Sequence, residues 1–93
     1  MRGAVQLHVL YHAALGEVDG AWMSEELARH GYHISPGTLY PTLHRMEAEG
    51  LLVSRVELVE GRRRRRYLAT ETGRRVLAET RRALRELAEE VLE

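Results

Sequence analysis

Apolar residues in the first third of the chain recur every three or four positions, which is the period of a helix with one buried face. This pattern predicts a first helix over residues 2–15 and a second, shorter helix over residues 22–29. Residues 16–20 between them contain two glycines and an aspartate, so we expect a loop there. Ser24 is the expected N-cap of the second helix, because a serine hydroxyl can accept a hydrogen bond from the first turn.

A third helix is marked at both of its ends. Ser35 and Pro36 are favoured at the N-cap and the first helical position, and Gly50 is favoured just after a helix end. A short turn that contains glycine joins this helix to the second one, as in a helix-turn-helix motif. The apolar residues expected on its buried face are Leu39, Leu43 and Met46.

The period changes to that of a strand after the third helix. Residues 53–60 are rich in β-branched residues, and residues 63–69 form the expected return strand, with Gly61 and Arg62 at the hairpin tip. Three helices followed directly by a hairpin are the order of a winged helix-turn-helix. We therefore expect a mainly α fold with a two-stranded antiparallel wing.

A last helix is expected over residues 71–93, with Thr70 as its N-cap. Its apolar positions alternate in steps of three and four, as in a coiled-coil seam. The residues of this seam are Leu77, Thr80, Leu84, Leu87 and Val91. Residues 71–93 are therefore expected to be a C-terminal dimerisation helix, joined in one compact unit to a winged-helix domain of residues 1–70.

Length and composition exclude several classes of protein. A chain of 93 residues supports one domain with a marginal core, so dimerisation would add useful burial. The absence of Cys excludes a disulfide scaffold, a Cys-ligated zinc module and a Cys nucleophile. No apolar run reaches the length of a membrane span, and the start of the chain does not resemble a signal peptide, so we expect a cytoplasmic protein. Without a phosphate-binding glycine loop or a nucleophile motif, we expect neither an enzyme nor a required cofactor.

The charge is balanced overall but uneven along the chain. There are 14 basic and 14 acidic residues, yet residues 51–70 hold six Arg against two acidic residues, and five of these Arg are consecutive. Adjacent like charges repel one another, so the run favours contact with a nucleic acid over a merely solvated tip. Strand alternation would point Arg63 and Arg65 to one face and Arg62, Arg64 and Arg66 to the other.

The start of the third helix carries small polar side chains, which allow a phosphate or a base edge to approach closely. Thr38 and Thr42 lie one turn apart, and we expect them on the face opposite Met46. The residues expected to contact DNA are Ser35, Gly37, Thr38, Tyr40, Thr42, Arg45, Arg62, Arg63, Arg64 and Arg65.

Two segments together, ISPGTLYPTLHRMEAEGLL and GRRRRRYLATETGRRVL, closely resemble the short-chain branch of the PadR family of winged-helix transcriptional regulators. The matching elements are Leu39-Tyr40-Pro41, Glu49-Gly50-Leu51 and the Arg-Tyr-x-x-Thr-x-x-Gly junction of residues 66–73. The resemblance implies a homodimer, packed through its first and last helices, that represses transcription and releases DNA when an effector binds. Its two-fold symmetry would be mirrored in a pseudo-palindromic operator. The residues expected at the dimer interface are Leu7, Tyr11, Leu77, Leu84, Leu87 and Val91.

Two histidines of the first helix form a candidate metal site. His8 and His12 are four positions apart, which puts both imidazoles on one helix face, where they can chelate zinc, cadmium or nickel. The alternative is a pair of partly buried histidines at the dimer interface that titrate near neutral pH. The candidates for a third ligand are His30, His33, Glu79 and Glu86.

Two further expectations remain open between alternatives. Trp22 either packs in the core or contacts an effector, because a flat aromatic ring beside a cleft suits a planar ligand. Tyr67 is expected in the core.

The alternative function for the chain is a protein-interaction module that binds a partner through its last helix and does not bind DNA. The run of five Arg argues against this alternative.

Overall fold

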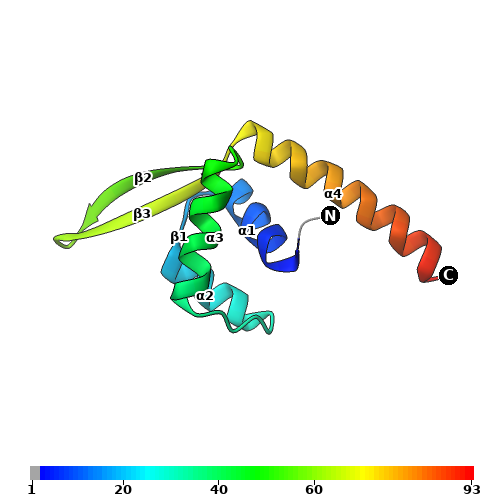
Figure 1. Ribbon diagram of the computed structural model, residues 1–93, viewed down its shortest axis with the longest axis horizontal. Coiled ribbons are helices and arrows are strands. Elements are labelled where there is room, and N and C mark those ends of the chain that lie inside the picture. The colour runs from blue at the N-terminus through cyan, green and yellow to red at the C-terminus, as the bar shows by residue number, and fades with distance from the viewer. Residues whose placement is uncertain (1–2) are drawn as a thin grey trace.

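Four helices and three β-strands make up residues 3–93, the part of the chain that the computed structural model describes. In chain order they are α1 (Ala4–Leu15), β1 (Val18–Asp19), α2 (Gly20–Arg29), α3 (Pro36–Ala48), β2 (Leu52–Val59), β3 (Arg62–Ala69) and α4 (Glu71–Val91). Figure 1 shows α1, α2 and α3 grouped in a body, with the β2–β3 hairpin and α4 leaving it in opposite directions. The expected mainly α winged helix-turn-helix is confirmed. Residue 2, where the first helix was expected to begin, lies outside the described residues.

The segment expected as a loop, residues 16–20, contains a strand. β1 pairs antiparallel with β3, with Val18 opposite Tyr67 and Asp19 opposite Arg66, so the sheet has the order β1-β3-β2. Two residues are too few to show the alternation of a strand, and the pairing depends on contacts distant in sequence. β1 places the start of α2 beside the wing.

The N-cap of α2 is Asp19 and not Ser24. The Asp19 carboxylate accepts a hydrogen bond from the backbone N–H of Trp22 at 2.8 Å, and Ser24 lies inside the helix. Aspartate is as good an N-cap as serine, so the helix can begin earlier than its apolar pattern suggests. Gly20 follows the cap, and a side chain there would collide with the ring of Tyr40 from α3. The two helices of the helix-turn-helix therefore approach closely at this glycine.

The wing is a hairpin of two eight-residue strands, with Leu52 opposite Ala69 at its base. Glu60 and Gly61 form the turn, and their φ angles are 53° and 75°. Positive φ at both central residues is typical of the type I′ turn, whose twist matches that of the strands. Arg62 is therefore the first residue of β3 and not part of the tip.

A single hydrophobic core lies where α1, α2 and α3 meet the inner face of the sheet. The three apolar residues predicted for α3 are buried, and so is Tyr67, as expected. The core also contains Val9, Leu10, Met23, Leu27, Leu51 and Leu52. The predicted cap of α4 is confirmed, because the Thr70 hydroxyl accepts a hydrogen bond from Gly73 N at 2.9 Å.

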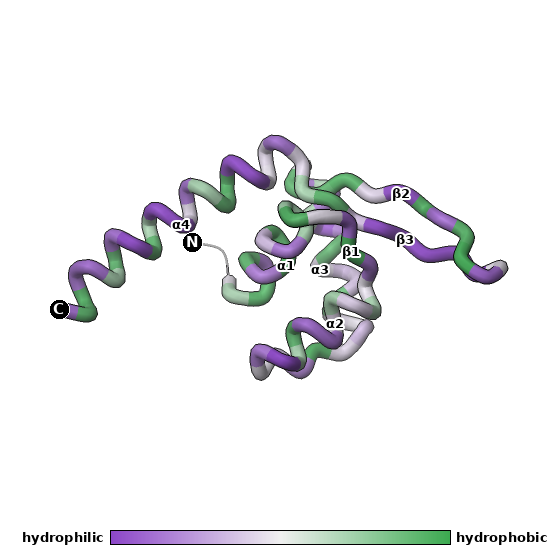
Figure 2. Tube along the Cα trace, turned by 180° about the vertical axis from the view of Figure 1, so that it is seen from behind, coloured by the Kyte–Doolittle hydropathy of each residue, from purple (hydrophilic) through white to green (hydrophobic). Residues whose placement is uncertain are grey.

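α4 leaves the body after Leu77. This leucine is 7% exposed and packs in the core of its own chain, so only a small part of its side chain is left for a dimer seam. The reason is that the capped first turns of α4 lie against α1. Within the described chain no later residue of α4 is buried, and Figures 1 and 2 show this outer half running away from the body. No helix in residues 3–93 is long and apolar enough to cross a bilayer.

Candidate nucleic-acid interface and a histidine cluster

The start of α3 is exposed on the outside of the body. Ser35 is the N-cap residue and Pro36 the first helical residue, as predicted. The Ser35 hydroxyl lies 3.4 Å from the Thr38 hydroxyl and makes no capping bond to the helix backbone. Ser35, Gly37 and Thr38 are all exposed. Small side chains at the positive end of a helix dipole allow an anion to approach closely.

Thr42 does not belong to this exposed surface. Its side chain is 7% exposed, and its hydroxyl donates to the carbonyl oxygen of Thr38 at 2.9 Å. Residues four apart share a helix face, so Thr42 lies on the same side as Met46, and the expectation that it lies opposite is wrong. Thr42 is therefore a core residue and not a DNA contact. Arg45, the other predicted residue of this half of α3, is exposed.

A cleft of about 210 Å³ lies between α3 and the wing. Tyr40 and His44 line it from α3, and Arg63, Arg64 and Arg65 line it from β3. His44, one helical turn after Tyr40, is with Arg45 a weaker candidate from the sequence for contact with DNA, and the structure brings it into this cleft. The cleft gathers a phenol, an imidazole, three guanidinium groups and the carboxylate of Asp19, which pairs with Arg64. The phenol, the imidazole and the other two guanidinium groups are hydrogen-bond donors that suit a phosphate.

The arginines of the wing divide between its two faces, as alternation predicts. Arg63 and Arg65 lie opposite Leu58 and Val56, on the inner face that continues towards Tyr67 and the core. The even-numbered arginines of the run point to the outer face. The two faces differ in whether acidic side chains lie close to the arginines.

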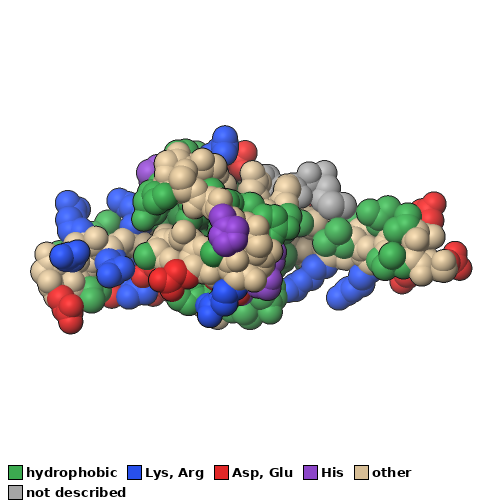
Figure 3. All heavy atoms as spheres, turned by 90° about the horizontal axis from the view of Figure 1, so that it is seen from below, with side chains coloured by type: hydrophobic (Ala, Val, Ile, Leu, Met, Phe, Trp, Pro, Cys, Tyr) green, Lys and Arg blue, Asp and Glu red, His purple; other side chains and the backbone are tan. Residues whose placement is uncertain are grey.

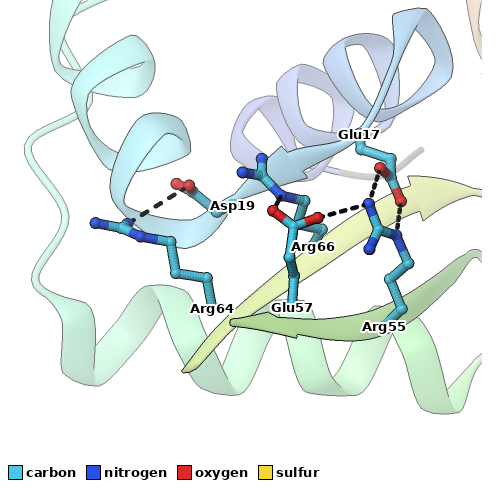
Figure 4. A network of polar contacts seen from close by, with 6 residues as sticks. All are labelled: Glu17, Asp19, Arg55, Glu57, Arg64 and Arg66. Carbon is cyan, nitrogen blue, oxygen red and sulfur yellow. Dashed lines mark hydrogen bonds and ion pairs between the residues drawn. The ribbon is translucent and has the colours of Figure 1, made fainter. Parts of the chain in front are cut away.

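Acidic side chains pair with three arginines of the outer face, Arg55, Arg64 and Arg66 (Figure 4). The residues of this network are Glu17, Asp19, Arg55, Glu57, Arg64 and Arg66. Arg55 lies at its centre, with nitrogen–oxygen distances of 2.6 and 2.7 Å to Glu17 and 2.9 Å to Glu57. Glu57 also accepts a hydrogen bond from Arg66 Nε at 3.2 Å. Arg64 Nη1 of β3 lies 3.6 Å from a carboxylate oxygen of Asp19 in β1. Hydrogen bonds from Arg55 lower the pKa of both Glu17 and Glu57. This network ties β1 to the wing.

In the part of the chain that the structure describes, the inner face and the first position of β3 carry arginines without acidic partners. Within residues 3–93, Arg62 and Arg63 form no ion pair or hydrogen bond through their side chains. Arg65 Nη1 donates to the hydroxyl of Ser54 at 3.0 Å, which leaves its charge uncompensated. Figure 3 shows basic side chains gathered along the wing. These three guanidinium groups are available to an external anion.

An open groove of about 670 Å³ runs between α1 and α4. Four residues predicted at the dimer interface line it: Leu7, Tyr11, Leu77 and Leu84. Arg81 lies over the Tyr11 ring, 5.6 Å from its centroid. Leu87 and Val91 continue the exposed seam along α4 and are 49% and 63% exposed. An apolar stripe of this length beside a groove is typical of a surface that another helix covers.

Three histidines that line this groove lie close to one another. The ring nitrogens of His8, His12 and His30 that could hold an ion all lie within 4.8 Å of one another. A carboxylate oxygen of Glu26 lies 3.1 Å from Nε2 of His30 and 3.4 Å from Nε2 of His12. The structure thus adds His30 to the predicted pair and brings in Glu26, which was not predicted. Glu26 precedes His30 by one helical turn, and that spacing is its sequence signal.

The pKa shifts of His12 and Glu26 favour metal binding. Burial lowers the pKa of the His12 imidazole, and Glu26 opposes this only in part. Burial alone would raise the pKa of Glu26, but hydrogen bonds from Arg29 and His30 outweigh it and lower that pKa. A neutral imidazole and an ionised carboxylate are the forms that ligate a metal. The remaining candidates for a third ligand, His33, Glu79 and Glu86, are exposed and lie outside the cluster.

Comparison with known proteins shows the family. Residues 9–79 match the model of the family described as "Transcriptional regulator PadR-like family". The chain belongs to the PadR-like family. The resemblance read from the sequence is thereby confirmed. The match covers α2, α3 and the whole wing, and it leaves outside it His8 and the outer half of α4.

Individual relatives agree with this membership. Transcriptional regulator Rv3488 of Mycobacterium tuberculosis is 66% identical over 91 residues, which are 98% of this chain and 85% of that protein. A PadR family transcriptional regulator from Eggerthella lenta is 33% identical, with a TM-score of 0.84 over 97% of this chain and 80% of the other. Bacillus subtilis PadR in complex with operator DNA has the same fold, with a TM-score of 0.74 and 18% identity over 82% of this chain and 45% of the other.

Trp22 of this PadR-like protein lies at the surface and not in the core. It is 39% exposed and lines a cavity of about 400 Å³ together with Glu17, Asp19 and Arg66. Its indole meets the ring of His12 edge-on, with the centroids 5.2 Å apart. Of the two alternatives for Trp22, core packing is thus wrong, and an effector contact stays a prediction.

Proposed function

We propose that this PadR-like transcriptional regulator binds double-stranded DNA as a homodimer and represses transcription. The observation that carries the proposal is the cleft between α3 and the wing, where arginines without acidic partners face the exposed side of α3. In a helix-turn-helix the second helix enters the major groove, so α3 is the element proposed to meet base edges. Bacillus subtilis PadR, solved in complex with operator DNA, has the same fold, which supports the proposal that this chain binds DNA.

The proposed contacts fall into two groups. Arg62, Arg63 and Arg65 are assigned to phosphates, because they are exposed and lie on a wing that runs beside the groove-reading helix. Such contacts set the position of the protein without reading sequence. The residues assigned to the groove and its edges, at the start and on the exposed side of α3, are Ser35, Gly37, Thr38, Tyr40 and Arg45.

A second copy of the chain is the proposed occupant of the α1–α4 groove. Leu84 and Leu87 are 42% and 49% exposed on a helix that its own body does not cover. A heptad-like seam gives two copies of α4 a way to bury these side chains against each other and against α1. A two-fold dimer presents two copies of α3, which favours a pseudo-palindromic operator.

Fluorescence anisotropy tests DNA binding. The labelled duplex carries the DNA upstream of the protein's own gene, and a scrambled duplex of equal length is the control. We expect tighter binding to the first duplex, with an affinity that falls steeply as salt rises, because phosphate contacts release counterions. Absence of binding to both duplexes at low salt would overturn the proposal. The alternative, a protein-interaction module that uses the seam of α4, would then be favoured if the mass in solution is that of a monomer.

We further propose that release of DNA is controlled by an effector, and that the effector is a divalent transition-metal ion held by His8, His12, His30 and Glu26. Two ligands on one ion, each about 2.0–2.1 Å from it, cannot be more than about 4.2 Å apart. The imidazole nitrogens are within 4.8 Å of one another, so small side-chain rotations suffice. Imidazole ligands suit zinc and nickel, and cadmium is the third ion to test.

Isothermal titration with zinc, cadmium and nickel tests the metal site. We expect heat of binding for the wild type and for His33→Ala, which removes an exposed histidine outside the cluster. His12→Ala and His30→Ala should each lose at least about tenfold in affinity, as loss of a ligand implies. No heat with any of the three ions would end the metal proposal, and a planar ligand beside Trp22 would become the effector to test.

A further inference from the structure

Glu47, near the end of α3, is joined to the wing through Ser54. One carboxylate oxygen of Glu47 accepts both donors of Ser54 from β2, the backbone N–H at 3.0 Å and the hydroxyl at 2.7 Å. Both residues are half-buried. Two hydrogen bonds to one ionised group fix the strand more firmly than one neutral contact does. The base of the wing is thereby held against α3.

The same serine continues to Arg65. Because the Ser54 hydroxyl donates its proton to Glu47, its lone pairs are turned towards the arginine, and Arg65 Nη1 donates to it at 3.0 Å. Arg65 lines the cleft beside Tyr40. The pKa of Tyr67 supports this closeness, since burial raises it and both Glu47 and Arg65 act on it. A chain of three groups therefore runs from a carboxylate of α3 to a guanidinium above the cleft.

Arg65 differs from its neighbours in the kind of partner that holds it. Arg64 and Arg66 face the carboxylates of Asp19 and Glu57 directly, and a carboxylate competes with a phosphate for the same guanidinium. A hydroxyl orients the guanidinium but does not neutralise it. The Glu47 carboxylate accepts the proton of the Ser54 hydroxyl and so orients its lone pairs towards Arg65, without contacting Arg65 itself.

We propose that Glu47 and Ser54 are positioning residues that aim Arg65 at a DNA phosphate in the cleft between α3 and the wing. This inference rests on the proposed DNA binding and deepens it, because it says how the helix that reads DNA sets the geometry of the wing. The competing explanation is that Glu47 and Ser54 only hold β2 in place.

Charge alone and positioning predict opposite changes in DNA affinity when Glu47 is replaced. A carboxylate close to DNA repels phosphates, so removing it should strengthen binding if only its charge mattered. We expect Glu47→Ala to weaken binding, and Glu47→Gln to weaken it less, because the amide oxygen can still accept from Ser54. Glu57→Ala is the matched control on the outer face, where loss of an acid should strengthen binding or leave it unchanged.

Ser54→Ala is the sharpest variant, because it removes only the hydroxyl and keeps the carboxylate. We expect its affinity for the duplex from upstream of the gene to fall roughly three- to tenfold, the factor that one net hydrogen bond is worth. The slope of log affinity against log salt should fall by about one, as expected when one phosphate contact is lost. Ser54→Thr retains a hydroxyl and should restore both values. Thermal melting of each variant checks that the fold is intact.

A double-mutant cycle decides between positioning and simple support. In an Arg65→Ala background, Ser54→Ala should have no further effect on DNA affinity if the serine acts through Arg65. Equal effects of Ser54→Ala in both backgrounds would overturn the inference, and so would wild-type affinity and salt slope in Ser54→Ala. If the wild type binds no duplex at low salt, the proposed DNA binding fails first, and this result differs from either of those.

Discussion

The wing and the outer half of α4 are the two arms of the molecule, and they are exposed for different reasons. Both project from the body, in opposite directions (Figure 1). The wing presents guanidinium groups that its own acids do not neutralise, whereas α4 presents leucine and valine side chains that its own core does not cover. A guanidinium is well solvated in water, but an apolar stripe is unfavourable in water at all times. We therefore expect the stripe to be covered permanently and the wing only when an anion binds.

Salt concentration should affect the contacts of the two arms differently. Contacts with phosphate weaken as counterions compete, while apolar burial does not weaken in the same way. Raising the salt concentration is therefore expected to release DNA while the dimer persists.

The largest effect is expected from Leu84→Glu with Leu87→Glu. Two carboxylates in the seam would be buried without partners, so the dimer should dissociate to monomers, as measured by light scattering after gel filtration. A monomer engages one half-site, so affinity for the upstream duplex should fall by at least about 100-fold. Arg82→Ala, on the same helix but outside the seam, is the control and should stay dimeric. A variant that is monomeric and still binds with full affinity would show that the arms are independent.

The second prediction concerns the link between the arms. The histidine cluster lines the α1–α4 groove, whereas the proposed DNA surface is the cleft between α3 and the wing. Imidazoles ligate a metal only when neutral, so metal affinity should fall by more than about tenfold between pH 7.5 and 5.5. Burial lowers the pKa of His12, which favours its neutral, metal-ligating form. Titration calorimetry at several pH values measures this dependence, and a flat profile would contradict ligation by histidine.

Addition of the metal to the protein–DNA complex then tests whether metal binding at the histidine cluster changes the affinity for DNA. If zinc lowers the anisotropy of the wild-type complex but not that of His12→Ala, the cluster acts on the wing through the body. Tight zinc binding without any change in DNA affinity would separate the two sites and leave the cluster without a regulatory role.

The third prediction acts on the wing alone. Arg63→Ala and Arg65→Ala should each weaken DNA binding several-fold for every sequence and reduce the salt slope by about one. Arg66→Ala is the control, because the Arg66 guanidinium is already paired with Glu57 and its loss should matter less. Titrations with the upstream and scrambled duplexes across a salt series measure both quantities. A change in sequence preference at constant salt slope would instead assign these arginines to base edges.

The same comparison explains what could be predicted from the sequence. Both arms were predictable, because a run of arginines and a seam with steps of three and four are local patterns. The hairpin and the cap at Thr70 were predictable for the same reason. Failures occurred where the chain folds back on itself. β1 is two residues long and exists only because it pairs with β3, and Leu77 is buried only because α4 crosses α1.

The two candidate sites show the same limit. Helical spacing correctly puts His8 and His12 together, but it cannot show that α2 ends beside them and so brings in His30 and Glu26. The prediction that Thr42 is exposed failed for a different reason, because helical spacing alone was sufficient to place it. Thr42 lies four residues before Met46 and therefore shares its buried face. The cleft that joins His44 to the wing depends on the packing of α3 against the sheet, which no local pattern describes.

The smallest effect is expected from Glu17→Gln, which removes one partner of Arg55 in the outer network of the wing. Glu17 and Arg55 are largely exposed, and such pairs restrain side chains more than they stabilise a fold. The pKa of Glu17 is lowered in the folded state, so its contribution is present above the usual carboxyl range and is lost as the pH falls through the lowered value. We expect a slightly lower Tm for the variant at about pH 7, and a difference in Tm that shrinks as the pH falls through the lowered pKa and the carboxyl becomes protonated in the folded chain as well.

About 1 M salt should also remove the difference in Tm at neutral pH, because exposed charges are screened there. A difference that persists at low pH and high salt would mean that Glu17 supports the wing by packing and not by charge. The wing would then be held by the same kind of contact as α4, and the contrast between the two arms would apply only to the surfaces they present to partners.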